Sequence, residues 1–203
     1  MPIITVDGNI GAGKSSILNF LHKNHNVYVD LEPIDKWKTF LDNIYNNKTN
    51  FFNFQIRVWL DRSWIQEKDK TSVILMERSP YFIRNTFNKY SYDNDYVNKN
   101  EYTIINELYD KTDIIWKSNY YIYIRSSPKK CLERILKRGR DNEMNISLEY
   151  LKEIHDLHEN SYNEAVKNNF NIIVIDIENK SFEEIAFIIN NFIKNINLKN
   201  DSL

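Results

Sequence analysis

Three of the four glycines in this 203-residue chain lie within a single stretch of six residues, and a lysine and a serine follow directly. The stretch is Gly8-Asn9-Ile10-Gly11-Ala12-Gly13-Lys14-Ser15, which fits the pattern G-x-x-x-x-G-K-[ST]. An apolar run, Ile3 to Val6, precedes it, and an apolar stripe with helical spacing, Ile17, Leu18 and Leu21, follows it. A strand, a glycine-rich turn and a helix in this order favour folds that hold phosphate at the start of the helix.

The rest of the chain repeats the alternation of strand and helix. Five short apolar runs predict buried parallel strands: Ile3 to Val6, Val27 to Leu31, Ser72 to Met76, Tyr120 to Ile124 and Asn171 to Ile175. Two further stretches have helical spacing: Ile104, Ile105, Leu108, Ile115 and Trp116, and then Leu148, Leu151, Ile154 and Leu157. Crossovers of this length predict an α/β fold with a five-stranded parallel sheet flanked by helices. With no repeat and no Pro/Gly/Ser-rich linker, we expect one domain over residues 1–203.

Composition and charge exclude several classes of function. The formal net charge is −1, from 27 Lys and Arg against 28 Asp and Glu, which argues against a surface that tracks nucleic acid. No apolar run reaches the roughly 18 residues of a membrane helix, and neither a signal peptide nor a transit peptide is visible. The lone Cys131 excludes an internal disulfide and fits a reducing compartment. We therefore expect a cytoplasmic protein with no nucleic-acid or membrane partner.

The glycine-rich stretch has a specific phosphate chemistry. Its backbone N–H groups converge on phosphate oxygens, Lys14 reaches the β- and γ-phosphates, and the Ser15 hydroxyl ligates Mg²⁺. A glycine-rich turn that matches the pattern by chance is the alternative. The stretch predicts a nucleoside triphosphate site, but it leaves kinase, GTPase, ATPase and helicase open.

Charged residues also follow the second and third predicted strands, at the edge where ligands bind in parallel sheets. Glu32 follows the second strand, and Glu77 and Arg78 follow the third. For phosphoryl transfer, Glu32 can serve as the base, Glu77 as a direct or water-mediated Mg²⁺ ligand, and Arg78 as a clamp. A purely structural ion pair between Glu32 and Arg78 is the alternative.

A second basic cluster lies at residues 134–145. Arg134 and Arg138 are four residues apart and share a helix face, Gly139 offers a hinge, and Arg140 follows. Arginines bind phosphate with two parallel hydrogen bonds, so this segment could act as a lid over ATP that excludes water. A solvated helix face is the alternative.

Taken together, these segments resemble the deoxyribonucleoside kinase family, which includes deoxycytidine, deoxyguanosine and mitochondrial thymidine kinases and the insect multisubstrate enzyme. The resemblance runs to about Glu159. Its blocks are Asp7 to Ser15, Glu32-Pro33-Ile34-Asp35-Lys36-Trp37, Phe54-Gln55, Glu77-Arg78-Ser79, Arg134 to Arg140 and Ser147-Leu148-Glu149-Tyr150-Leu151. It implies a P-loop kinase fold with an arginine-rich lid, with ATP and Mg²⁺ as cofactors and a homodimer that pairs helices from the middle of the chain.

The resemblance also implies roles for single residues. Glu32 takes the proton of the 5′-hydroxyl, Arg78 holds that part of the sugar, and Glu77 lies near the metal. Tyr45 and Glu143 match residues that bind the 3′-hydroxyl, and Gln55 matches the amide that pairs with the base edge. Aromatic walls of the nucleoside slot are implied at Phe87 and Trp37, with Ile10, Phe54 and Val58 nearby. Phosphate-binding lid arginines are implied at Arg134, Arg138 and Arg140. Without the resemblance, the apolar members of this set would be interpreted as ordinary core.

The chain departs from the family pattern at three places. The interval between Tyr45 and Gln55 is one residue short, Asn142 replaces an acidic residue, and Pro80 follows Ser79. For base choice, Arg62 resembles an arginine of deoxycytidine- and purine-type members, whereas Ile83 stands where those members have an aspartate. An arginine without that partner is expected to turn to solvent or to pair with Asp61, which enlarges the slot.

The sequence therefore predicts ATP-dependent phosphorylation of the 5′-hydroxyl of deoxyribonucleosides in nucleotide salvage, leaning to pyrimidines with relaxed base choice. One alternative is a nucleoside monophosphate kinase of the thymidylate kinase kind, which needs a cationic seat for the acceptor's phosphate and no general base. The other is a catalytically silent nucleotide-binding subunit on the same fold.

Overall fold

The computed structural model describes residues 3–25, 27–63, 73–115, 118 and 120–200 of the chain. Five parallel strands form one sheet in the order β2-β3-β1-β4-β5. Their bounds are β1 (Ile3–Asp7), β2 (Tyr28–Asp30), β3 (Ile74–Glu77), β4 (Tyr120–Arg125) and β5 (Ile172–Asp176). Each predicted apolar run overlaps one of these strands, so the prediction of a five-stranded parallel sheet is confirmed. Ser72, the predicted start of the third strand, lies outside the described residues.

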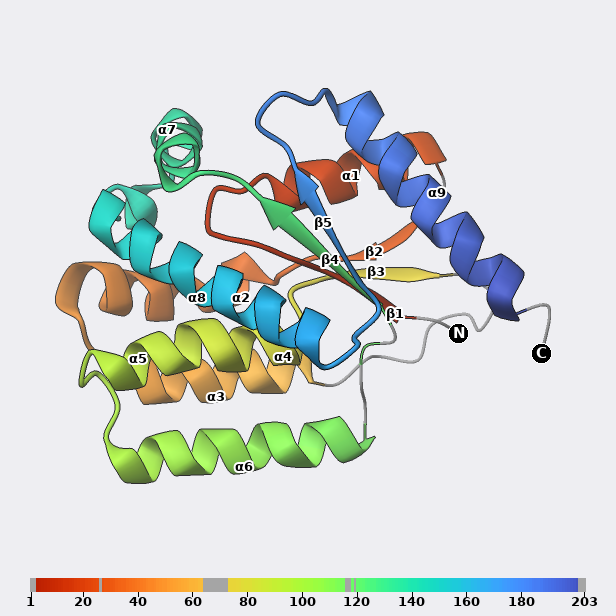
Figure 1. The fold of residues 1–203 in the computed structure, drawn as a ribbon. Helices are drawn as coiled ribbons and strands as arrows, with labels where there is room; N and C mark the ends of the chain where they lie inside the picture. Colours follow the sequence, from red (N-terminus) through yellow and green to blue (C-terminus); the bar gives the residue numbers. More distant parts are fainter. Residues whose placement is uncertain (1–2, 26, 64–72, 116–117, 119, 201–203) are drawn as a thin grey trace.

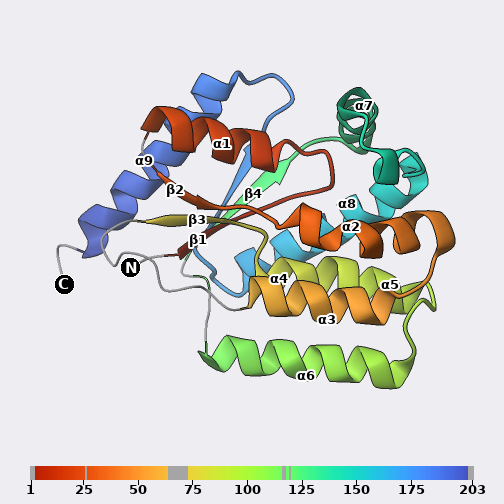
Figure 2. The ribbon, with the colours of Figure 1, turned by 180° about the vertical axis from the view of Figure 1, so that it is seen from behind.

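Helices cover both faces of the sheet (Figures 1 and 2). Helices α1 and α9 pack on one face, whereas α8, α4 and α5 lie on the other. Helix α3 runs beside α4 and α5, and α6 packs outside them against α3 and α4, so that α3 and α6 together form an outer layer. The helices are α1 (Lys14–His25), α2 (Ile34–Asp42), α3 (Phe51–Arg62), α4 (Pro80–Ile83), α5 (Lys89–Asp93), α6 (Lys99–Ile115), α7 (Pro128–Arg138), α8 (Leu148–Lys167) and α9 (Phe182–Asn200). Three short turns of π or 3-10 type join them: η1 (Asn43–Asn47), η2 (Arg84–Asn88) and η3 (Asp141–Glu143).

The parallel sheet brings charged residues from distant parts of the sequence to one edge. Central strand β1 is fully buried at Ile4 and Val6, as expected for a strand covered on both faces. Because all strands run in the same direction, their carboxyl ends lie together, and there β1 ends at Asp7, β2 at Asp30 and β3 at Glu77. This edge is where ligands of parallel sheets bind.

Two predicted helical stripes are confirmed only in part. In α8, Leu151 and Ile154 are fully buried, but the next buried residue is His158, whereas Leu157 is half-buried. The His158 ring is buried because it stacks on Tyr123 of the sheet, with a centroid distance of 6.0 Å. Burial therefore depends on the contact with the sheet and follows the apolar pattern only approximately.

Helix α6 presents a similar difference. Ile105 is fully buried, but its neighbour Ile104 is 47% exposed, and Trp116 lies outside the described residues. The layer formed by α3 and α6 thus leaves part of the predicted apolar stripe uncovered.

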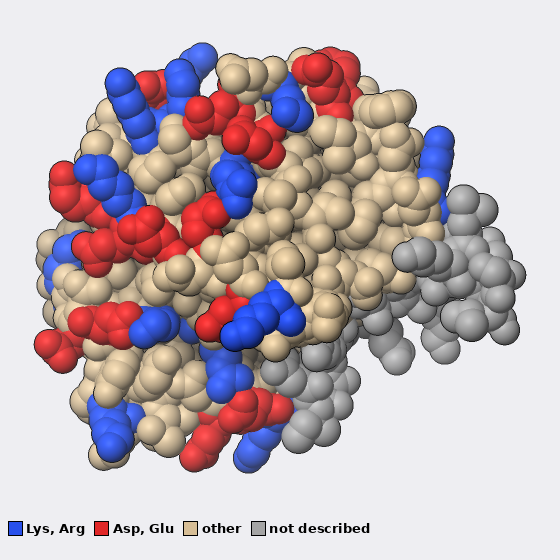
Figure 3. Space-filling model, viewed as in Figure 1, with Lys and Arg blue, Asp and Glu red and all other residues tan. Residues whose placement is uncertain are grey.

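The surface carries charges of both signs. On the face of the described residues that Figure 3 shows, Lys and Arg alternate with Asp and Glu, and no area of a single sign dominates. None of the helices in the described part of the chain combines the length and the apolar character needed to cross a bilayer.

Candidate active site

The glycine-rich loop packs too closely against the rest of the fold for any side chain at two of its positions. A Cβ atom at Gly11 would lie 2.4 Å from the carbonyl oxygen of Cys131, and one at Gly8 would lie 2.4 Å from that of Ile124. Gly11 also has a φ of +74°, which L side chains rarely adopt. Glycine at these positions lets the loop turn tightly between β1 and α1, as a phosphate cradle requires.

Lys14 is buried at the start of α1, beneath the loop. Its Nζ donates to the carbonyl oxygen of Asn9 at 3.0 Å and lies 4.0 Å from Glu77 Oε1. Burial and the nearby positive charge of Arg78 lower the pKa of Lys14 to about 8. A buried ammonium group with one carbonyl partner and a distant carboxylate is suited to gain a phosphate oxygen as a further ligand.

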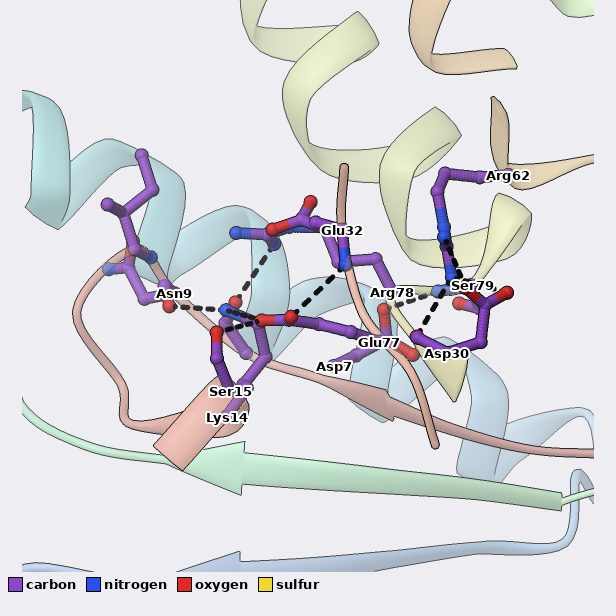
Figure 4. Close-up of polar contacts among 12 residues, drawn as sticks. Asp7, Asn9, Lys14, Ser15, Asp30, Glu32, Arg62, Glu77, Arg78 and Ser79 are labelled. Atoms are coloured by element: carbon purple, nitrogen blue, oxygen red, sulfur yellow. Dashed lines mark hydrogen bonds and ion pairs between the residues drawn. The ribbon is translucent and has the colours of Figure 1, made fainter. Parts of the chain in front are cut away.

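Ser15 and Glu77 form a pair of oxygen groups next to Lys14 (Figure 4). The Ser15 hydroxyl donates to Glu77 Oε1 at 2.8 Å, and the backbone N–H of Glu32 donates to Glu77 Oε2 at 3.3 Å. A hydroxyl and a carboxylate are the kind of hard oxygen ligands that Mg²⁺ accepts beside phosphate oxygens. The residues present therefore fit the predicted metal site.

Glu32 and Arg78 form a buried ion pair next to the loop. Arg78 Nε donates to Glu32 Oε1 at 2.6 Å, and the two side chains are only 8% and 10% exposed. Arg78 Nη1 donates to the carbonyl oxygen of Gly8 at 3.0 Å, and its guanidinium lies 4.5 Å from the ring centroid of Phe87. Burial alone would lower the pKa of Arg78, but the carboxylates around it, with Glu32 foremost, raise it.

The backbone at Arg78 is in an unusual conformation. Its φ is +64°, in the left-handed region that non-glycine residues rarely adopt. The surrounding structure holds it there, since the Arg78 N–H donates to Val6 and the next N–H, of Ser79, donates to Asp7 Oδ1 at 2.8 Å. Strain held in place by neighbouring hydrogen bonds is typical of residues that are positioned for function.

A cavity of about 290 Å³ opens in front of this ion pair. It contains most of the residues predicted for the site. The predicted residues that line it are Ile10, Gly11, Gly13, Lys14, Ser15, Glu32, Trp37, Tyr45, Phe54, Gln55, Val58, Glu77, Arg78, Ile83, Phe87, Arg138, Arg140 and Glu143. Gly8, Asn9 and Ala12 belong to the loop but not to the lining.

Apolar side chains and one buried amide also line the cavity. Gln55 is 2% exposed, and its Oε1 has no hydrogen-bond partner among the described residues. Val58, one turn further along α3, and Ile83 of α4 lie beside it in the lining. A buried amide oxygen without a partner costs about 1–3 kcal/mol, which a ligand that donates a hydrogen bond would recover.

Arg62 does not line this cavity, and the expectation that it turns to solvent or pairs with Asp61 is wrong. Arg62 is 1% exposed, and its guanidinium pairs with Asp30, with Nη1 3.4 Å from Oδ1 (Figure 4). The guanidinium also donates to the carbonyl oxygens of Asp30 and Leu31. Asp61 is engaged elsewhere, with Arg57. The last residue of β2 and the residue after it therefore offer Arg62 a carboxylate and two carbonyls that lie far away in the sequence.

Tyr45 and Glu143 lie together, as the resemblance implies. Burial and the charge of Glu143 raise the pKa of Tyr45, so its phenol stays protonated. Glu143 also accepts hydrogen bonds from both Arg138 and Arg140, the latter at 3.2 Å. The one-residue departure in the sequence before Gln55 thus leaves the tyrosine in the cavity wall.

The third predicted lid arginine is placed differently. Arg134 Nη1 donates to the Ser126 hydroxyl at 2.8 Å, and Arg134 is absent from the lining of the cavity. Helix α7 ends at Arg138, and the residue that caps it, Gly139, has a φ of +66°, so the break predicted at this glycine is confirmed. Arg138 and Arg140, on either side of this break, are the ones that reach the cavity.

Several lining residues were not predicted, although their spacing could have revealed them. Leu41 lies four residues after Trp37 on α2, and Ile44 lies three residues after Leu41 in η1. Tyr90 and Ser91 lie three and four residues after Phe87. Helical periodicity from a predicted wall residue marks these positions. The other unpredicted lining residues are Ser16, Asn19, Ile34, Phe51 and Tyr150.

Comparison with known proteins agrees with this geometry. The deoxynucleoside kinase family profile matches residues 4–198. A kinase protein of Invertebrate iridescent virus 6 is 34% identical over 201 residues, covering 95% of this chain and 99% of the relative. Deoxycytidine kinase of Bos taurus is 29% identical, covering 89% of this chain and 85% of the relative. The structure of deoxyadenosine kinase from M. mycoides with bound dATP matches with a TM-score of 0.77 at 26% identity, covering 94% of this chain and 98% of that chain.

Proposed function

The chain belongs to the deoxynucleoside kinase family and is thus an ATP-dependent kinase of nucleosides, and on this basis we propose a more specific reaction. The chain phosphorylates the 5′-hydroxyl of deoxyribonucleosides, with relaxed base choice and a preference for pyrimidines. The observation that carries this proposal is the common cavity of Glu32 and Lys14. A carboxylate that can take a proton and a lysine that can hold a phosphate line the same 290 Å³ space. Phosphoryl transfer to an alcohol needs both groups.

The proposed reaction proceeds by direct transfer. Glu32 accepts the proton of the 5′-hydroxyl, the freed oxygen forms a bond to the γ-phosphorus of ATP, and the bond from that phosphorus to the bridging oxygen breaks, releasing ADP. Arg78, which holds Glu32 Oε1 at 2.6 Å, keeps the carboxylate oriented and adds positive charge beside the transferring group. Lys14 and the loop N–H groups hold the phosphates of the donor.

Ser15 and Glu77 would hold Mg²⁺ in this proposal. When bound, the metal neutralises charge on the β- and γ-phosphate oxygens. In the structure these two side chains already share a hydrogen bond, and Glu77 accepts from the backbone of Glu32, so the metal site and the base are coupled through one carboxylate.

The sugar and the base would occupy the rest of the cavity. Tyr45 and Glu143 lie together where they can bind the 3′-hydroxyl, and the Gln55 amide, whose Oε1 has no partner among the described residues, would face the base edge. A side-chain amide offers a donor and an acceptor side by side and so can pair with more than one base. A cavity near the lower end of the usual range for small-molecule sites favours the smaller pyrimidine ring.

The pairing of the cavity's arginines favours a nucleoside over a nucleoside monophosphate as acceptor. Arg78, the arginine next to the proposed base, is paired with Glu32, whereas Arg138 and Arg140, which are paired with Glu143, are assigned to the phosphates of the donor. An acceptor with its own phosphate needs cations that are not already neutralised. On the donor side, Arg138 and Arg140 would exchange Glu143 for ATP phosphates as the proposed lid closes.

We also propose a homodimer through the layer formed by α3 and α6. Two apolar side chains on these helices, Leu60 and Ile104, are 46% and 47% exposed, and a second copy of the layer would cover them. A monomeric mass at micromolar concentration in light scattering would contradict this part of the proposal.

Initial rates with ATP and Mg²⁺ test the proposed function. Thymidine, deoxycytidine, deoxyadenosine and deoxyguanosine are compared as acceptors, and thymidylate is included as the alternative substrate. We expect turnover with several deoxynucleosides, highest with the two pyrimidines, and little with thymidylate. Faster phosphorylation of thymidylate than of thymidine would favour a monophosphate kinase, and ATP binding without any turnover would favour a catalytically silent subunit.

A further inference from the structure

One wall of the cavity, the indole of Trp37, is held by a hydrogen bond to a residue outside the cavity lining. Trp37 is 2% exposed on α2, and its Nε1–H donates to Asp61 Oδ2 on α3 at 2.7 Å. The ring also meets Phe54 edge-to-face, with centroids 5.6 Å apart and an interplanar angle of 86°. The indole is therefore held both by packing and by a hydrogen bond, and both contacts come from α3.

Asp61 is itself held in place by its neighbour one turn earlier. Arg57 Nε donates to Asp61 Oδ2 at 2.7 Å, and Arg57 Nη2 forms an ion pair with Oδ1. Burial alone would raise the pKa of Asp61, but the hydrogen bonds from Arg57 and Trp37 lower it, so the group is a carboxylate at neutral pH. The Asp61 side chain is 11% exposed and that of Arg57 is 35% exposed.

The carboxylate thus accepts from two donors that serve different purposes. The guanidinium of Arg57 binds both oxygens of Asp61 and so fixes the plane of the carboxylate. The carboxylate in turn orients the indole N–H of Trp37, which donates to Oδ2. Neither Asp61 nor Arg57 lines the cavity. The hydrogen bond from Trp37 to Asp61 connects this pair to a residue of the cavity wall.

We propose that Asp61, oriented by Arg57, is a positioning residue that fixes the Trp37 ring against which the nucleoside base packs. This inference rests on the proposed function of the cavity as a nucleoside site. A ligand that binds against a mobile aromatic side chain pays the entropy cost of ordering it, and a ring that is already fixed avoids this cost. Release of the ring from Asp61 should therefore weaken nucleoside binding and leave the phosphate chemistry unchanged.

The test compares Asp61→Leu and Arg57→Met with the wild type. Asp61→Leu should raise the KM for the nucleoside about three- to tenfold, the cost of ordering one freed side chain, with kcat and the KM for ATP within about twofold. Arg57→Met, which keeps the carboxylate but loosens it, should give a smaller increase in the same direction. The control is Asp93→Asn, which breaks an i,i+4 ion pair with Lys89 whose side chains are 42% and 46% exposed, and it should change neither KM.

A double-mutant cycle separates positioning from a general loss of stability. In a Trp37→Phe background the N–H donor is gone, so adding Asp61→Leu should raise the nucleoside KM by less than twofold further. An equal increase in both backgrounds, or no increase in the wild-type background, would overturn the proposal. Thermal melts of each variant establish that it is folded, and Asp61→Ala, which also removes the acceptor of the Trp37 N–H, replaces Asp61→Leu if that variant does not fold. Failure of the proposed function would show separately, as a wild-type protein that turns over no deoxynucleoside, and would overturn both.

Discussion

Replacement of Glu32 by glutamine isolates the proton-accepting role of its carboxylate. The amide keeps an oxygen that can accept from Arg78 Nε, which now lies 2.6 Å from Glu32 Oε1, and it has nearly the same volume. Arg78 also keeps its bond to the carbonyl oxygen of Gly8 and the charges of Glu77 and Asp7 nearby. We therefore expect the variant to fold and to bind nucleoside with a Kd within about threefold of the wild type.

The catalytic loss should be much larger than the loss of binding. A positioned general base contributes on the order of 10²–10⁴ in rate, so the barrier should rise by about 3–5 kcal/mol. The assay is the initial rate of ADP release at saturating ATP and deoxynucleoside, with nucleoside binding measured by calorimetry on the same samples. A kcat reduced about 100-fold or more, with binding retained, is the expected result.

Glu159→Gln is the matched control. Glu159 forms a similar ion pair, with Arg125 at 2.6 Å, but it lies outside the lining of the cavity. Its replacement should leave kcat within about twofold. If Glu32→Gln retained kcat near the wild-type value, Glu32 would not be the base, and its pair with Arg78 would be structural only.

Three other substitutions, one of them with a matched control variant, test separate parts of the structure. Arg62→Met should leave the ratio of kcat/KM for thymidine to kcat/KM for deoxycytidine unchanged, because the guanidinium pairs with Asp30 outside the cavity. A shift of this ratio towards thymidine would show that the Arg62 guanidinium reaches the base. Gly11→Ala should lower the Tm and weaken ATP binding at least tenfold, because its Cβ would lie 2.4 Å from a carbonyl oxygen of α7. The control is Gly139→Ala, whose Cβ would have no atom within 4 Å, so it should lower the Tm only through the preference of this backbone conformation for glycine. Burial raises the pKa of Asp7 from 3.8 to about 6, so folding favours its protonated form, and that stabilisation is complete below pH 4 and lost as the pH rises through 6. Asp7→Asn should therefore unfold in urea with up to about 3 kcal/mol more stability than the wild type at pH 7 and an equal stability at pH 4; equal stabilities at both values would contradict the raised pKa.

The fold and the phosphate end of the site follow from local features of the sequence. The loop, its lysine and its serine are contiguous, and each strand is a short apolar run, so their structure depends on neighbours in the chain. The placement of Glu32 and Glu77 near Lys14 then follows from the parallel direction of the strands, since carboxyl ends share one edge. Nothing beyond pattern and topology is needed to bring these groups together.

The choice of partner for a buried charge is decided only by the tertiary structure. Arg62 follows Asp61 in the sequence, yet it pairs with Asp30, 32 residues earlier. The reason is that the Arg62 side chain points from α3 towards the end of β2, whereas Asp61 points towards Arg57 and the Trp37 ring. Likewise, Arg134 and Arg138 share a helix face in the sequence pattern, but only Arg138 reaches the cavity, where Glu143 meets it. Periodicity determines which face of a helix a residue occupies, whereas the groups that approach this face from other elements determine the contacts that a long side chain makes.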